Sequence, residues 1–385
     1  MKTFLKILGG FLAGAVAGLL LAGAGGVLFG GMSCSEFLGA LSALGWAEAL
    51  GIALLSIVLF FVCMVLHVAL HEAGHLVCGL ATGYRFVSFR IFSLTLVRQD
   101  GCLRLKRYRL AGTGGQCLLE PSEGNDGRIP VFWYNAGGVL ANLLVSAVAL
   151  FLWLLPGEQP LPLSLFLLLL ALSGFFLAVL NGFPMKVGGM PNDAYNIRLL
   201  RNSVDNRRLM CLQLRVAARV LAGLRPGELP GEWFFHLKEV DYANPFQVAS
   251  ALLDVSWLED VGEWEEAYAR LEAAYVHRHE LPEVFGLEVC SELLFTALAT
   301  GRGQQADQLL TPRLRRYLEQ YKTVGSTRQR VLFAIALCLE HDEARARDIL
   351  RIVEAQSDRY LMQGEVAMDV ALMHEMLARQ SPDKA

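Results

Sequence analysis

The chain has 385 residues, of which 54% are apolar, and its 34 basic and 37 acidic residues give a net charge of −3. A nucleic-acid-binding protein needs a dense basic surface, so this balance argues against nucleic acid as a partner. Residues 195–385 hold 23 of the basic and 28 of the acidic residues. We therefore expect a membrane-embedded domain over residues 1–194 and a cytosolic domain over residues 195–385.

The first segment is an apolar, glycine-rich run over residues 7–31, preceded by Lys2 and Lys6. A secretory signal has the same order of features, and the Ala-Gly-Ala sequence at residues 22–24 resembles a cleavage site. The run continues well beyond that point. A retained transmembrane helix is therefore favoured, and a cleaved signal peptide over residues 1–24 is the alternative.

The second apolar run, residues 50–80, is long enough to cross a bilayer as a helix and contains the pattern His-Glu-x-x-His at residues 71–75. Residues four apart lie on one face of a helix, so the rings of His71 and His75 can reach one metal ion. Zinc accepts such nitrogen ligands. Glu72 lies beside that face, where it can act as the general base of a hydrolysis. Polar residues are costly in a membrane helix and therefore indicate function.

His67 precedes His71 by four residues and shares its helix face. Residues 67 and 75 are separated by about 12 Å along a helix that rises about 1.5 Å per residue. One zinc ion cannot reach all three rings at about 2 Å. We expect His67 to be a supporting or interfacial residue and not a ligand.

The loop after this helix is rich in basic residues, which places it in the cytoplasm by the positive-inside rule. The basic residues are Arg85, Arg90, Arg98, Arg104, Lys106, Arg107, Arg109 and Arg128. Within the loop, residues 86–110 contain two β-prone runs around Asp100-Gly101, which predicts a β-hairpin. Such a hairpin can receive an extended peptide as an added strand. A purely structural hairpin whose arginines contact lipid headgroups is the alternative.

Two further transmembrane helices are predicted over residues 129–155 and 163–182. The first contains Asn142, which is costly in an apolar helix unless it is hydrogen-bonded. The second ends at residues 181–184, where glycine and proline break the helix, and Asp193 follows on the cytoplasmic side. A catalytic zinc needs a third protein ligand, and Asp193 is the candidate. The alternative is that Asp193 caps the helix that follows it.

Taken together, these motifs resemble the site-2 protease family of intramembrane zinc metalloproteases. The similarity covers about residues 51–196. It rests on the His-Glu-x-x-His helix, on Gly-Val-Leu-Ala-Asn at residues 138–142, and on Asn-Gly-Phe-Pro at residues 181–184 followed by Asp193. The resemblance implies a protease that cuts membrane-protein substrates in or near their transmembrane segments, as in regulated intramembrane proteolysis.

The resemblance also assigns roles to individual residues. It implies one Zn²⁺ per chain, held by His71, His75 and Asp193, with Glu72 as the catalytic base. Asn142 and Asn181 match family positions that help to place the substrate, and the hairpin matches a membrane-associated sheet that engages it.

Two features depart from the family pattern. Asp193 lies twelve residues after Asn181 and is followed by alanine, and residues 187–190 form an insertion before it. The neighbouring Asn192 carries an amide, a much poorer zinc ligand than a carboxylate, so its replacement by alanine is expected to leave the metal bound. Two other interpretations stay open: an inactive membrane scaffold that binds partners, and a protease of the prenyl-protein-processing type.

The sequence of the C-terminal half predicts a soluble all-α domain of tetratricopeptide-like repeats. Related short motifs begin at Gly262, Gly301 and His341, and each carries an alanine five residues further on. The resulting spacings of 39 and 40 residues are typical of helical-hairpin repeats. Stacked repeats offer a concave surface for a cytosolic protein partner. An ordinary helical bundle is the alternative.

The expected protein is therefore mainly α, with about four membrane helices, a small cytosolic β-hairpin or sheet, and a helical-repeat domain. We expect a multi-pass protein of the plasma membrane, with its N-terminus and its C-terminal domain in the cytoplasm.

Overall fold

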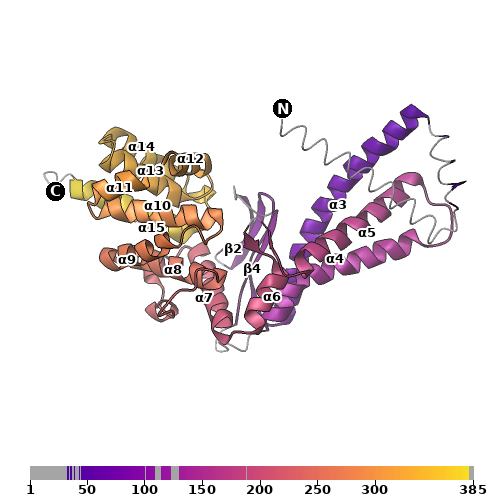
Figure 1. Cartoon of the computed structure of the whole chain (residues 1–385), viewed down its shortest axis with the longest axis horizontal. Coiled ribbons are helices and arrows are strands. Elements are labelled where there is room, and N and C mark those ends of the chain that lie inside the picture. Colours follow the sequence, from indigo (N-terminus) through magenta and orange to yellow (C-terminus); the bar gives the residue numbers. More distant parts are fainter. Residues whose placement is uncertain are drawn as a thin grey trace. The chain divides into compact units, whose positions relative to one another are not determined.

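The computed structural model describes residues 45–99, 101–108, 114–122, 130–187 and 189–380, with isolated positions between 33 and 43 (Figure 1). The predicted helix over residues 7–31, the alternative signal peptide and the start of the predicted turn at residue 100 lie outside the described residues. The described part is mainly helical and contains a small antiparallel sheet. The predicted mainly α fold is confirmed to that extent.

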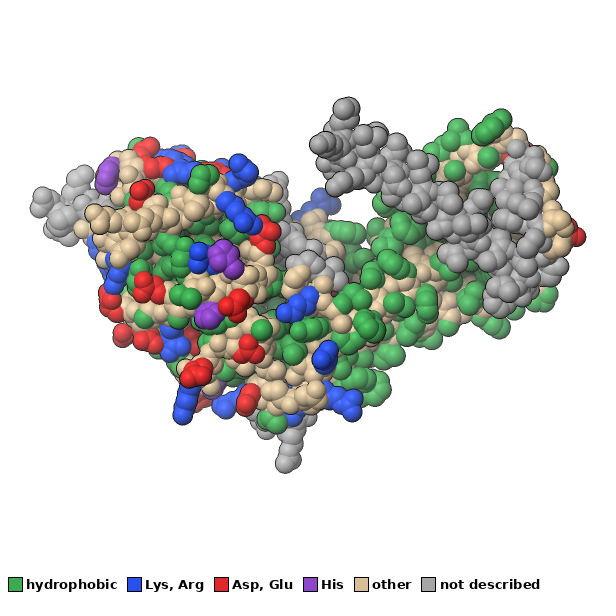
Figure 2. Space-filling model, in the orientation of Figure 1, with side chains coloured by type: hydrophobic (Ala, Val, Ile, Leu, Met, Phe, Trp, Pro, Cys, Tyr) green, Lys and Arg blue, Asp and Glu red, His purple; other side chains and the backbone are tan. Residues whose placement is uncertain are grey.

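Three long apolar helices have the length and composition needed to cross a membrane. They are α3 (Trp46–Ala81), α4 (Val131–Trp153) and α5 (Leu161–Gly182). At about 1.5 Å per residue, each is longer than the roughly 30 Å hydrocarbon core of a bilayer. Hydrophobic side chains cover these helices on the face drawn in Figure 2, whereas charged side chains gather over the C-terminal helices. Three of the four predicted membrane helices are thus found, with ends within a few residues of those expected.

A four-stranded antiparallel sheet connects α3 to α4. Its strands are β1 (Arg85–Ile91), β2 (Leu94–Gln99), β3 (Cys102–Arg107) and β4 (Gly115–Glu120), in the order β3-β2-β1-β4. The predicted turn is confirmed, because Gln99 pairs with Cys102 and Gly101 has a φ of +76°. The expected first arm of the hairpin is divided by a second turn at Phe92, whose φ is +51°. The sheet is therefore larger than the predicted hairpin over residues 86–110.

Helices α3 and α4 approach each other closely at two glycines. A Cβ atom on Gly74 would lie 2.2 Å from the carbonyl oxygen of Gly137, and a Cβ atom on Gly137 would lie 2.3 Å from that of Gly74. Membrane helices use such small residues to bring their backbones together. This contact brings the histidine-bearing end of α3 against the first turns of α4.

The C-terminal part of the chain is a set of helices. They are α6 (Asp193–Arg201), α7 (Val204–Leu221), α8 (Pro245–Val261), α9 (Trp264–Val276), α10 (Glu283–Ala299), α11 (Gly303–Leu309), α12 (Pro312–Tyr321), α13 (Ser326–Cys338), α14 (Glu343–Ala355) and α15 (Gln363–Gln380). Helix α7 covers one face of the sheet, where its Ala218 and Leu221 pack with Val87, Val97 and Leu118.

Three helix pairs share one turn geometry. In the turns of α8–α9, α10–α11 and α13–α14, the residues Gly262, Gly301 and His341 have positive φ angles of +84°, +76° and +53°. The alanine five residues after each turn is fully buried in the second helix of its pair. The recurring sequence motif thus corresponds to a recurring local structure. A tetratricopeptide-like array stays a prediction.

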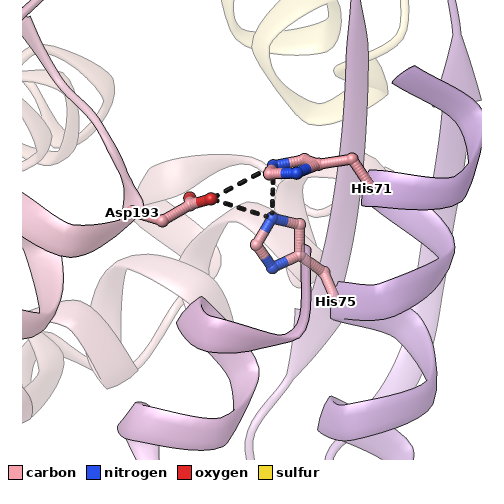
Figure 3. Close-up of side chains that lie close together, drawn as sticks. All are labelled: His71, His75 and Asp193. Atoms are coloured by element: carbon pink, nitrogen blue, oxygen red, sulfur yellow. Dashed lines mark hydrogen bonds and ion pairs between the residues drawn. The ribbon is translucent and has the colours of Figure 1, made fainter. Parts of the chain in front are cut away.

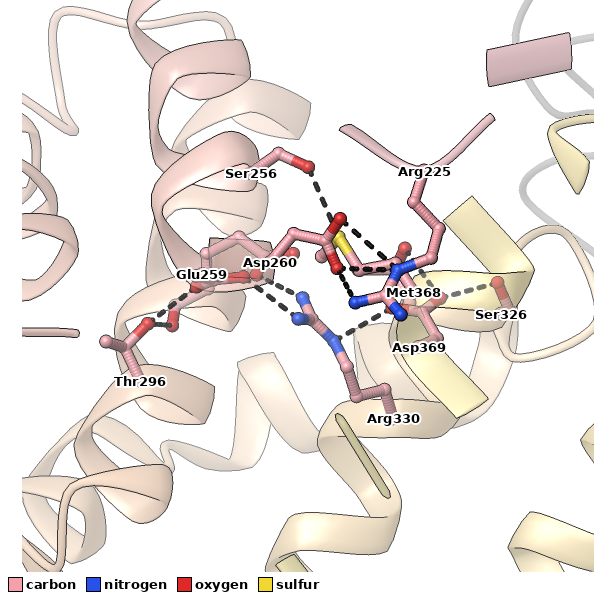
Figure 4. Close-up of polar contacts among 11 residues, drawn as sticks. Arg225, Ser256, Glu259, Asp260, Thr296, Ser326, Arg330, Met368 and Asp369 are labelled. Atoms are coloured by element: carbon pink, nitrogen blue, oxygen red, sulfur yellow. Dashed lines mark hydrogen bonds and ion pairs between the residues drawn. The ribbon is translucent and has the colours of Figure 1, made fainter. Parts of the chain in front are cut away.

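A buried ionic cluster ties four of these helices together (Figure 4). The Arg330 side chain on α13 is 1% exposed and contacts carboxylates from three other helices. Its partners are Glu259 on α8 at 2.9 Å, Glu292 on α10 at 2.5 Å and Asp369 on α15 at 3.0 Å. A guanidinium presents five N–H donors in a fixed plane, so one side chain can bind all three acids.

The described residues fall into two compact units. The described residues within 1–67 and 142–178 form one unit, and those within 68–141 and 179–385 form the other. The two histidines of the motif, the sheet and Asp193 all belong to the second unit. The predicted division into residues 1–194 and 195–385 stays a prediction.

Candidate metal centre

Three side chains from α3 and α6 converge on one point (Figure 3). Asp193 Oδ2 lies 3.1 Å from His71 Nε2 and 3.5 Å from His75 Nε2. The two Nε2 atoms are 3.1 Å apart. Among the described residues, these three form the group of histidine, cysteine and acidic side chains whose ligand atoms lie within 4.8 Å of one another. The structure thus brings the three predicted ligands together.

The donor set fits a zinc ion. His75 Nδ1 lies 2.7 Å from the carbonyl oxygen of Tyr134, and a ring that donates there presents the lone pair of Nε2 to the centre. Metal-binding histidines are commonly oriented in this way by a second hydrogen bond. Two imidazole nitrogens and one carboxylate oxygen also match the three protein ligands of many catalytic zinc sites.

Asp193 is ionised in this environment. Burial raises the pKa of its carboxyl, but the contacts with His71 and His75 outweigh burial and hold the pKa at about 2. A carboxylate must be deprotonated to bind a metal. The carboxylate of Asp193 therefore has the charge that a metal ligand requires.

Glu72 lies against the edge of the sheet. A Cβ atom on Gly115 of β4 would lie 2.5 Å from Glu72 Cγ and 2.7 Å from its Oε1. The carboxylate is outside the group of three converging ligands. Its position leaves it available for proton transfer.

A side chain at residue 115 should displace Glu72 without contacting the three converging side chains. For the peptide hydrolysis that the resemblance implies, we expect Gly115→Val to lower the rate at least tenfold and to leave zinc binding unchanged, because the added atoms occupy the space of the Glu72 carboxylate. Zinc content by mass spectrometry and cleavage in detergent measure the two effects. Gln116→Val, at an exposed position on the same strand, is the control. An unchanged rate in Gly115→Val would contradict this packing argument.

Two residues near the site have roles that the sequence did not indicate. Arg90 on β1 is 3% exposed and donates to the carbonyl oxygens of Phe92 at 2.9 Å and Gly115 at 3.3 Å. Burial lowers the pKa of its guanidinium, and the charge of Glu72 opposes that shift. Tyr134 supports His75 through its carbonyl, and its hydroxyl donates to the carbonyl of Cys117 at 2.7 Å.

His67 and Asn142 contact each other inside the other compact unit. Both side chains are fully buried, with His67 Nδ1 3.1 Å from Asn142 Oδ1. His67 Nε2 lies 2.8 Å from the carbonyl oxygen of Leu170. His67 is thus a buried supporting residue, as expected, and the cost of Asn142 in an apolar helix is offset by a hydrogen bond. Substrate positioning by Asn142, and by Asn181 in the last turn of α5, stays a prediction.

The insertion before Asp193 has a defined structure. It forms a small hairpin of β5 (Lys186–Val187) and β6 (Met190–Pro191). Asn192 then caps α6 by accepting a hydrogen bond from the amide of Tyr195 at 3.0 Å. The cap of α6 is therefore Asn192, and Asp193 is the first residue of the helix.

Comparison with protein families finds one match. Residues 44–189 match the family described as Peptidase M50B-like. No curated protein and no solved structure matches the chain. The matched segment contains His71, Glu72 and His75 and ends four residues before Asp193. Residues 44–189 are thus similar to the Peptidase M50B-like family, and this match confirms the resemblance of that segment to the site-2 proteases.

Proposed function

We propose that this protein is an intramembrane zinc endopeptidase in which His71, His75 and Asp193 hold the metal. The observation that carries the proposal is the convergence of these three side chains. Proteases of the M50 family are generally zinc-dependent, and the apolar helices indicate a membrane protein. The alternative of an inactive scaffold does not explain why these three potential ligands converge close to Glu72.

The chemistry that a zinc ion supplies in such a site is Lewis-acid activation of the scissile carbonyl and of the attacking water. Glu72 would accept a proton from the attacking water at its carboxylate and would pass it to the leaving amine. The Tyr134 carbonyl holds the His75 ring in the required orientation. Gly115 leaves the space in which the Glu72 carboxylate lies.

The substrates that we propose are transmembrane segments of other proteins. The peptide bonds of a membrane helix are held in backbone hydrogen bonds, so the segment must unwind before cleavage. Strand β4 is an edge strand of the sheet, and its Gly115 packs against Glu72. This proximity supports a role for the sheet in holding an extended substrate. We place the protein in the plasma membrane, with its basic sheet, N-terminus and helical domain in the cytoplasm.

The helical domain is proposed to bind a cytosolic partner that regulates the protease. The support is a contact between the hairpin that precedes Asp193 and the start of α10. A Cβ atom on Gly189 would lie 3.0 Å from Pro282 Cβ, and the adjacent Leu281 is buried with Val248 and Val289. A partner that shifts α10 would therefore also shift the hairpin of β5 and β6, which precedes the proposed ligand Asp193.

Loss of zinc from ligand variants tests the proposed function. We expect His75→Ala and Asp193→Ala to lose zinc to a similar extent, because two remaining ligands make a poor site. Zinc per chain is measured by mass spectrometry after purification in detergent. The control is Asp205→Ala, which removes an exposed acid from the first turn of α7. A full complement of zinc in Asp193→Ala would remove Asp193 from the site.

A further inference from the structure

We propose that Asn192 is a positioning residue that holds the Asp193 carboxylate at the metal centre, an inference that rests on the proposed function. Its side chain joins the broken end of α5 to the start of α6. These bonds fix the connection between the two helices immediately before Asp193, the proposed third ligand.

The Asn192 side chain uses its full hydrogen-bonding capacity and is 8% exposed. Its Nδ2 donates to the carbonyl oxygens of Leu180 at 2.5 Å and Phe183 at 2.7 Å. Its Oδ1 accepts from the amides of Met185 at 3.2 Å and Tyr195 at 3.0 Å. Four bonds from one side chain therefore span residues 180–195.

The two ends that Asn192 joins each have backbone groups without helical partners. The last carbonyls of a helix and its first amides lack intrahelical bonds. At the end of α5 they include the oxygen of Leu180, and the next free oxygen is that of Phe183, the residue after the helix; at α6 one of them is the amide of Tyr195. Asparagine carries two donors and an acceptor on one side chain, so it can satisfy both ends together.

The backbone at Asp193 depends on these hydrogen bonds more than the backbone at the two histidines does. His71 and His75 are held in the long helix α3, whereas Asp193 follows the short hairpin of β5 and β6. The backbone amide of Asn192 also donates to the carbonyl of Met185 at 3.1 Å, which closes this hairpin at its base. The side-chain bonds to α5 then fix the closed hairpin to the membrane helix. These contacts argue against the expectation that Asn192 can be replaced without effect on the metal.

A serine variant separates helix capping from anchoring. Ser203 caps α7 by accepting from the amide of Asn206 at 3.1 Å, so serine at residue 192 can still cap α6. Serine cannot donate to both the Leu180 and Phe183 carbonyls. Asn192→Ser therefore removes the anchor to α5 and keeps the cap, whereas Asn192→Ala removes both. Ser203→Ala is the matched control that removes a cap elsewhere.

The experiment measures zinc affinity of the full-length protein in detergent, by competition with a chromophoric chelator. We expect Asn192→Ser and Asn192→Ala to weaken zinc binding by about 10–100-fold, the usual effect of removing a residue that supports a ligand. Ser203→Ala should bind zinc as the wild type does. Wild-type affinity in Asn192→Ser would overturn the inference, because capping alone would then suffice.

Amide hydrogen exchange of the metal-free proteins gives a second readout. Residues 185–196 should exchange faster in both Asn192 variants, while α13 keeps its protection. Unchanged exchange in residues 185–196, or loss of protection throughout the chain, would also overturn the inference. Failure of the proposed function is recognised separately, because the wild type itself would then bind no zinc at this site.

Discussion

Replacement of Glu72 by glutamine should abolish proteolysis and leave about one zinc ion per chain. Loss of a general base lowers the rate by about 10²–10⁴-fold, and an amide cannot accept the proton at neutral pH. Glutamine has nearly the same shape as glutamate, so it fits the space beside Gly115. The three proposed ligands, His71, His75 and Asp193, are unchanged in this variant.

The substrate for this measurement can be found with the same variant. Membranes that contain the wild type or Glu72→Gln are compared by mass spectrometry for transmembrane peptides that are cut only in the first. A confirmed substrate is then assayed with both purified proteins in liposomes. Glu48→Gln, at an exposed position in the first turn of α3, is the control. Cleavage at the wild-type rate by Glu72→Gln would favour a different base or a non-enzymatic role.

The parts of the fold that the sequence predicts well are those that depend on local pattern. Membrane helices need about 20 apolar residues in succession, which defines α3, α4 and α5 closely. The Asp-Gly turn between β2 and β3 is also a local signal. Strand β4 is different, because its pairing with β1 joins Gly115 to Ile91 across 24 residues. No short-range pattern encodes such a partner.

The same distinction holds at the metal centre. The approach of His71 and His75 to one point can be predicted from helical spacing alone, and Asp193 was expected to join them as a third ligand. The support of His75 comes from the Tyr134 carbonyl, and a backbone group carries no signature in the sequence. Asn192 looks like an ordinary helix cap next to Asp193. Its bonds to α5 appear only when the chain is folded.

Replacement of Arg330 by methionine should give the largest loss of stability in the helical domain. The side chain is the common partner of Glu259, Glu292 and Asp369, and its guanidinium also stacks on Phe295 at 3.9 Å. Burial raises the pKa of Glu292 to about 8, although Arg330 opposes that shift. Without the arginine, the buried acids Glu259 and Asp369 and the partly buried Glu292 lose their counter-charge.

Removal of one partner from a buried ionic group costs about 3–5 kcal/mol, because the remaining charge has neither water nor a partner. We therefore expect Arg330→Met to lower the free energy of unfolding by about that amount, measured by denaturant titration of the full-length protein in detergent. The control is Arg347→Met, which breaks an exposed pair with Glu343 on α14 and should cost less than about 0.5 kcal/mol. Equal losses in the two variants would contradict the role of the cluster. A double variant that also replaces Asp369 by leucine should recover part of the loss, since it removes one of the unpaired acids.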